Sequence, residues 1–82
     1  MKDRNYLEMV LLGKLMTDKT IYFDNHSLLS ADLFACEENK RLFIILDNSY
    51  QNTGRCDMTE FYNKSKDKYK AITQMYKKMI SG

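Results

Sequence analysis

The sequence predicts an all-α fold, a compact bundle of five to six short helices, from three observations. Apolar residues recur at spacings of three and four, the period of a helix with one buried face. No long segment alternates apolar and polar residues as a half-buried strand does. The chain has no proline and no convincing hairpin turn. Its 82 residues fit one small domain with one core.

The first helix is expected to begin at Asn5, because Asn5 and Glu8 have the spacing of a capping box. Gly13 interrupts this helix at a cost of about 1 kcal/mol relative to alanine. Close approach of another helix would explain why the glycine is tolerated. The apolar stripe of the helix is expected to consist of Leu7, Val10, Leu11, Leu12 and Leu15.

Two shorter helical pieces are expected next. Thr17-Asp18 supplies a stop and a new cap, and the apolar segment 21–23, followed by Leu28 and Leu29, predicts a short second helix with a buried side. Ser30 is expected to cap a single turn that inserts Leu33 and Phe34 into the core.

A longer helix is expected from Glu37 to Gln51. The negative charges of Glu37 and Glu38 suit the positive N-terminal end of the helix dipole. The segment 52–54, which ends in glycine, is a plausible C-terminal stop. Its buried face is expected to hold Leu42, Phe43, Leu46 and Tyr50.

The last third of the chain should contain two more helices. Asp57 or Thr59 is expected to cap a short helix carrying Phe61-Tyr62, followed by a polar loop or weak helical continuation over residues 63–67. A final amphipathic helix begins near residue 67. Its apolar positions are Tyr69, Ile72, Tyr76, Met79 and Ile80.

Charge is distributed unevenly along the chain, whose formal net charge is +2. Residues 64–82 contain six lysines and one aspartate, a local balance of +5, so the remainder is net −3. Lysines can contact phosphates and the tyrosines between them could stack on unpaired bases. Tyrosines at helical spacing more often fill a core, and the lysines between them more often keep the opposite face solvated. We therefore expect weak or no direct contact with nucleic acid.

No residue of the chain is expected to be catalytic or to bind a metal or cofactor. Gly13-Lys14 lacks the remaining residues of a phosphate-binding loop. His26 has no recognisable catalytic partners, and Cys36 and Cys56 lack metal-binding or redox spacing. No apolar run is long enough for a membrane span and no secretory signal is visible. The sequence thus predicts a cytoplasmic protein that is not an enzyme, with reduced thiols.

Four short motifs occur in an order that resembles the N-terminal domain of DnaB-type replicative DNA helicases. Residues 8–18, EMVLLGKLMTD, resemble the opening E-Q-x-V-L-G-x-L-[LM]-x-D of that family. Residues 29–34 and 39–43 resemble its L-x-x-[ED]-D-F and H-x-x-[IL]-[FY] elements, and Gly54, Asp57 and Thr59 resemble a later one. The resemblance spans roughly residues 6–64. Met9, Asn39 and the short Asp57-to-Thr59 interval depart from the family pattern. The chain could thus be a divergent phage, plasmid or mobile-element relative.

The resemblance implies a non-catalytic domain that assembles subunits and docks a primase or a helicase loader. Residues 1–64 would form the helical core, and residues 65–82 would begin a hairpin that pairs two subunits of a hexamer. The ATPase motor lies outside this chain, and the second hairpin arm is expected to be short or missing. The interface would then involve Tyr69, Ile72, Tyr76, Met79 and Ile80.

Two other classes of protein remain open at this point. The chain could be the helicase-binding domain of a primase, which would place it on the other side of the same contact. It could instead be a small helical DNA-binding protein that uses its basic end.

Overall fold

The first helix begins earlier than the capping-box motif predicts, and its cap lies two residues before Asn5. The computed structural model describes residues 3–81, and the side chains of residues 3–78. Helix α1 spans Arg4–Thr17, and the Asp3 side chain caps it by accepting a hydrogen bond from the Tyr6 N–H at 2.8 Å. The prediction of an Asn5 cap was wrong, because Asp3 caps equally well. The Asn5 side chain is therefore free to bond elsewhere in the fold.

The buried face of α1 is rotated from the predicted leucine stripe. Leu12 and Leu15 are fully buried as expected, and Gly13 is buried beside them. Leu7 was expected on this face but is 57% exposed. Glu8 takes its place on the buried side, because it has hydrogen-bonding partners there.

Helix α2 follows the predicted cap. It spans Lys19–Asp24, and the Asp18 side chain accepts a hydrogen bond from the Thr20 N–H at 3.0 Å. Tyr22 is buried and stacks on Tyr50 with 4.4 Å between ring centroids. This aromatic contact attaches the short helix to the longest one.

Two single 3-10 turns connect α2 to the long helix. They are η1 (His26–Leu28) and η2 (Ala31–Leu33), and Ser30 precedes η2 without making the expected side-chain cap bond. Phe34 is buried as predicted and stacks on Phe43 at 5.0 Å. Leu33 is 41% exposed, so its predicted place in the core was wrong. Leu33 is the last residue of η2, whereas Phe34 follows it in an extended conformation, so the two neighbouring side chains point in different directions.

Helix α3 is confirmed almost as predicted. It spans Glu37–Thr53 and ends at Gly54, which has a φ of 72°. Only a glycine adopts this left-handed conformation without strain, so it is a typical C-terminal stop. The four predicted inward positions are all buried: Leu42, Phe43, Leu46 and Tyr50.

The chain ends in helices α4 (Thr59–Lys64) and α5 (Lys66–Ser81). The Asp57 side chain accepts a hydrogen bond from the Thr59 N–H at 3.1 Å at the start of α4. A polar loop over residues 63–67 was one expectation, but Ser65 alone separates the two helices. The polar residues of this segment lie at a corner between α4 and α5, where Asn63 and Lys64 are exposed to solvent.

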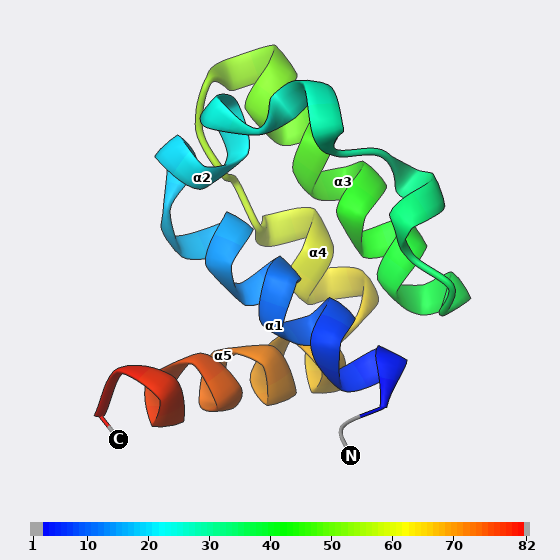
Figure 1. Cartoon of the computed structure of the whole chain (residues 1–82), viewed down its shortest axis with the longest axis vertical. Helices are drawn as coiled ribbons and strands as arrows, with labels where there is room; N and C mark the ends of the chain where they lie inside the picture. Colours follow the sequence, from blue (N-terminus) through cyan, green and yellow to red (C-terminus); the bar gives the residue numbers. More distant parts are fainter. Residues whose placement is uncertain (1–2, 82) are drawn as a thin grey trace.

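The five α-helices share one core in the described part of the chain. Figure 1 shows α5 lying across one end of the bundle, beneath α1 and α4, while α2 lies toward the opposite end. Ile72 of α5 and Phe61 of α4 belong to the same buried cluster as Leu12 and Leu46. Residues 3–81 form no strand, which confirms the all-α prediction. No helix within these residues is both long and apolar enough to cross a membrane.

Candidate protein-docking surfaces

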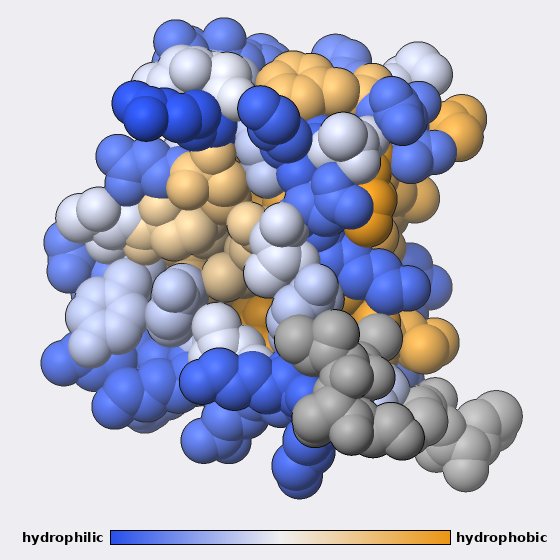
Figure 2. Space-filling view, turned by 90° about the vertical axis from the view of Figure 1, so that its left-hand side faces the viewer, coloured by the Kyte–Doolittle hydropathy of each residue, from blue (hydrophilic) through white to orange (hydrophobic). Residues whose placement is uncertain are grey.

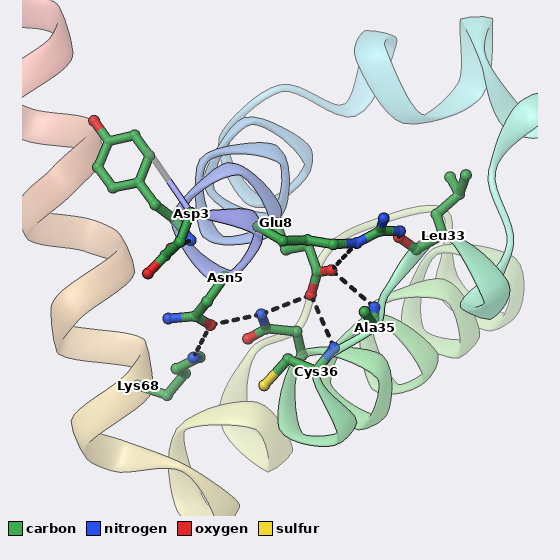
Figure 3. A network of polar contacts seen from close by, with 10 residues as sticks. Asp3, Asn5, Glu8, Leu33, Ala35, Cys36 and Lys68 are labelled. Atoms are coloured by element: carbon green, nitrogen blue, oxygen red, sulfur yellow. Dashed lines mark hydrogen bonds and ion pairs between the residues drawn. The ribbon is translucent and has the colours of Figure 1, made fainter. Parts of the chain in front are cut away.

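A buried carboxylate fixes α1 against the start of α3. Glu8 is only 5% exposed, and its oxygens accept hydrogen bonds from the backbone N–H groups of Ala35 at 2.8 Å and Cys36 at 3.3 Å. The Arg4 guanidinium bonds Glu8 at 3.0 Å and also donates to the Leu33 carbonyl at 2.9 Å. Figure 3 shows Glu8 pointing from α1 toward these groups. Glu8 thus holds three segments of the chain together.

The same network reaches α5 through two asparagines. Asn39 on α3 donates from its amide nitrogen to Glu8 at 3.0 Å and to Asn5 at 2.9 Å. Lys68 on α5 donates to the same Asn5 oxygen at 2.9 Å (Figure 3) and lies 3.7 Å from the Glu38 carboxylate. These contacts fix the positions of α1, α3 and α5 relative to one another.

The hydrogen bonds to Glu8 outweigh the effect of its burial. Burial alone would raise the pKa of a carboxyl group, because it disfavours the charged form. Four hydrogen bonds, from Asn39, Ala35, Arg4 and Cys36, act in the opposite direction and lower the pKa of Glu8 to about 2. Glu8 is therefore ionised at neutral pH, and its charge is neutralised by donors within the fold.

A small apolar groove lies where α1 crosses α5. It has a volume of about 150 Å³. A Cβ atom added to Gly13 would lie 3.3 Å from the side chain of Ile72 and 3.8 Å from that of Tyr76. The close approach of another helix at Gly13 is therefore confirmed. Half-buried side chains remain along the crossing, and the groove is lined by Gly13, Met16, Thr17, Ile72, Thr73, Tyr76 and Lys77.

The predicted interface residues of α5 have different environments. Ile72 is 1% exposed and packs in the core, so it offers almost no surface to another chain. Tyr69 is half-buried and contacts the rings of Phe61 and Tyr62 at 5.7 and 5.4 Å. Tyr76 is half-buried and lines the groove at the helix crossing. The side chains of Met79 and Ile80 lie outside the described residues.

A second apolar groove lies on the outer side of α1. Arg4, Leu7 and Leu11 line it from α1, Leu33 lines it from η2, and its volume is about 450 Å³. Periodicity could not reveal Leu7 and Leu33 as surface residues, because they continue the apolar pattern of buried neighbours. Figure 2 shows further apolar patches bordered by hydrophilic residues on the side of α2. Among residues 3–78, the other large exposed apolar residues are Phe23, Leu28 and Ile44. Phe23 and Leu28 were expected near the buried side of the second helix, and that part of the prediction was wrong because Tyr22 alone of α2 is buried.

Part of the basic charge near the C-terminus is paired within the fold. Lys64 lies 3.1 Å from Glu60, and Lys68 is 11% exposed beside Glu38. The Lys66 ammonium lies 5.3 Å from the centre of the Tyr62 ring. Lys70 and Lys78 are exposed on α5. The basic surface is therefore smaller than the sequence alone suggests.

The described residues contain no group of three or more histidine, cysteine or acidic side chains that could hold a metal ion. Cys36 and Cys56 are both half-buried free thiols.

The chain is an all-helical bundle with apolar grooves on its surface. It matches no protein-family model, no curated protein and no solved structure. The relation to DnaB-type helicases accordingly remains a resemblance, supported by the sequence motifs alone.

Proposed function

We propose that this chain is a non-catalytic docking domain, equivalent to the N-terminal domain of a DnaB-type replicative helicase. Its task would be to assemble helicase subunits and to dock a primase or a loader in the cytoplasm, while a motor outside this chain unwinds DNA. Four motifs in the family's order support the proposal, as does the all-helical bundle. The proposal requires no cofactor.

The groove at the crossing of α1 and α5 is the observation that carries the proposal. It is mostly apolar, and it runs beside the amphipathic helix α5, which crosses one end of the bundle (Figure 1). Apolar side chains in a groove bordered by polar residues are typical of the centre of a protein interface. A second copy of the chain is the proposed occupant, with Tyr76 as an anchor because aromatic residues dominate interface energetics.

Light scattering across a concentration series tests the assembly step. We expect the wild-type chain to form a dimer as its concentration rises, and Tyr76→Glu to raise the dissociation constant about tenfold or more. Gln74→Glu adds the same charge at an exposed position of α5 and serves as the matched control. Thermal unfolding of each variant separates lost association from lost folding. A wild-type chain that stays monomeric at about 1 mM, well above ordinary dimer affinities, would refute self-association.

Pull-down experiments with purified partners test the docking step. A primase helicase-binding domain should bind this chain if the chain is the helicase side of the contact. If instead an intact DnaB-type helicase binds it and the primase domain does not, the chain belongs to the primase side. Failure of both partners and of a loader to bind would reject the docking function.

DNA binding is a second candidate function, supported by the exposed Lys70 and Lys78 on α5. Contacts of this kind release counterions, so affinity for a duplex should fall steeply as salt increases. Fluorescence anisotropy with a labelled duplex measures this dependence. Lys70→Gln with Lys78→Gln should abolish binding if α5 carries it. Lys14→Gln with Lys19→Gln, at exposed positions of α1 and α2, is a control with the same loss of two charges.

A further inference from the structure

A wide groove between α3 and α4 has a different chemical character from the two apolar grooves. Its volume is about 570 Å³, within the range of roughly 300 to 1,000 Å³ that ligand sites occupy. Ile45 is a half-buried apolar residue in its lining, and most other lining side chains are amides or hydroxyls. The groove shares no residue with the crossing of α1 and α5.

Three asparagine side chains line this groove with their hydrogen-bonding capacity unused by the protein. Asn48 and Asn52 belong to α3, and Asn63 belongs to α4. All three are exposed, and none has a side-chain hydrogen bond to another residue in the described part of the chain. Each amide can donate two hydrogen bonds and accept two. The groove therefore offers donors and acceptors together, which is what a peptide backbone requires.

The spacing of the two amides on α3 matches the repeat of an extended peptide. Residues four apart on a helix rise about 6 Å along its axis. Alternate residues of an extended strand are about 6.8 Å apart, and they direct their backbone groups to the same side. Asn48 and Asn52 can therefore each contact one backbone repeat. A helical peptide has no free backbone groups along its length and cannot use this arrangement.

The wall at one end of the groove is held in place by its own hydrogen bonds. The Ser49 hydroxyl donates to the Arg55 carbonyl at 2.9 Å and accepts from the Asp57 N–H at 2.7 Å. The Thr53 hydroxyl bonds to the Ser49 carbonyl at 2.8 Å. These bonds fix the segment between α3 and α4, so the groove is formed before a ligand arrives. A preformed site loses less entropy on binding.

Asp57 is the charged group of the groove that can bind a basic side chain of the ligand, in competition with the nearby Arg55. Glu60 pairs with Lys64 at 3.1 Å, which leaves Asp57 as the remaining carboxylate of the lining. A hydrogen bond from the Thr59 N–H lowers the pKa of Asp57, and the Arg55 charge lowers it further. Asp57 is thus negatively charged at neutral pH, at the end of the groove fixed by Ser49.

We propose that the α3/α4 groove binds an extended peptide segment of another protein. Asn48 and Asn52 hydrogen-bond to the peptide backbone, and Asn63 contacts it from the α4 side. An apolar side chain of the peptide lies toward Ile45, and a lysine or arginine lies near Asp57. This binding does not depend on self-association through α5 or on the relation to replicative helicases. Its test is therefore independent of theirs.

Titration of the ¹⁵N-labelled chain with a blocked nine-residue peptide tests the proposal by NMR. The probe alternates valine with lysine and threonine, so that it favours an extended conformation. We expect the side-chain amide signals of Asn48, Asn52 and Asn63 to shift more than those of Gln74 on α5. The same peptide with alternate backbone nitrogens methylated lacks the donors that the asparagines would contact. Its affinity should fall about tenfold or more, since several hydrogen bonds are lost.

Two single substitutions locate the contact. Asn48→Ala and Asn52→Ala should each weaken binding about three- to tenfold, the effect of losing one or two hydrogen bonds. Alanine favours helix more than asparagine does, so α3 should remain folded in both variants. Gln74→Ala removes an exposed amide elsewhere and should leave the affinity unchanged. Asp57→Asn should weaken binding only of peptides that contain lysine, but the Asp57 hydrogen bond to Thr59 requires a thermal unfolding control.

Several outcomes would overturn the proposal. One is no shift of the groove amides at about 5 mM peptide, a concentration at which even a very weak complex forms. Equal binding of the methylated peptide would show that the backbone is not recognised. Stronger shifts of the same amides with an amphipathic helical peptide, or with an eight-nucleotide single-stranded DNA, would assign the groove to another ligand class.

Discussion

Gly13 of α1 faces Ile72 of α5 so closely that a Cβ atom at position 13 would lie 3.3 Å from the Ile72 Cγ2 atom. That distance is shorter than most carbon contacts, for which about 3.5 to 4.0 Å is optimal. Ile72 is buried and branched at Cβ, so its methyl group has little freedom to move away. The absence of a side chain at position 13 therefore sets how closely α1 and α5 approach.

Gly13→Ala is expected to destabilise the fold by about 1 kcal/mol. Alanine favours the helix by about 1 kcal/mol, but overpacking against Ile72 costs about 1 to 3 kcal/mol. Urea unfolding measures the difference. Ile72→Leu moves the branching methyl away from Cβ, so Gly13→Ala should cost less in that background. Identical costs in both backgrounds would contradict the steric explanation.

Removing the Glu8 carboxylate should cost about 3 kcal/mol of folding stability. Glu8→Ala leaves the Ala35 and Cys36 N–H groups without an acceptor, and the Asn39 amide keeps only its bond to Asn5. Each unpaired donor that stays out of water costs about 1 to 3 kcal/mol. Glu8→Gln retains the shape but loses the charge and turns an amide NH₂ group toward donors. Glu60→Gln, in an exposed ion pair, should change stability by less than about 1 kcal/mol. A Glu8→Ala variant as stable as Glu60→Gln would mean that this network contributes nothing.

The lowered pKa of Glu8 predicts a loss of stability in acid. Its folded-state pKa of about 2 lies below the ordinary value of 4.5, so the folded protein binds the proton less readily than the unfolded chain. The stabilising contribution is complete above about pH 4.5 and falls as the pH decreases toward 2. Unfolding free energies measured between pH 2 and 7 should show this decrease. In Glu8→Gln the decrease should be smaller, and an unchanged profile would assign the acid sensitivity to other carboxylates.

Cys56 should react slowly with alkylating reagents in the folded protein. Burial raises the pKa of its thiol to about 11, and the nearby Asp57 charge contributes in the same direction. The thiolate is the reactive form, so little of it is present at pH 8.5. In a Cys36→Ser background, iodoacetamide labelling at this pH should accelerate about tenfold or more in denaturing urea. Equal rates in folded and unfolded protein would show that the thiol is not protected.

Local sequence patterns were sufficient for the features that depend on neighbouring residues. Asp18 caps α2 and Gly54 ends α3, because both features depend only on hydrogen bonding or backbone conformation within a few residues. The apolar positions of α3 were predicted correctly because this central helix packs along one continuous face. The spacing of Asn48 and Asn52 on the opposite, polar side was also visible in the sequence, but no pattern indicated that α4 would lie beside it.

Local patterns failed where a distant partner competes for the same side chain. Asn5 and Glu8 have the spacing of a capping box, but in the fold Asn5 bonds to Asn39 of α3 and Lys68 of α5. Glu8 bonds to Ala35, just before α3. Leu7 fits the apolar stripe of α1 and is nevertheless exposed, because Glu8 and Met9 face the core instead. The difference between a buried and an exposed stripe depends on which side other helices cover.

The sequence by itself determined that this protein is helical, roughly where its helices lie and that its charge is concentrated near the C-terminus. These properties follow from periodicity, capping and composition, which act over a few residues. Only the tertiary structure decided that Ile72 is a core residue, that Lys68 is paired with Glu38 and that grooves form beside α1 and between α3 and α4. Such features arise from contacts between segments far apart in the chain, and the free energy of those contacts is not encoded in any one segment.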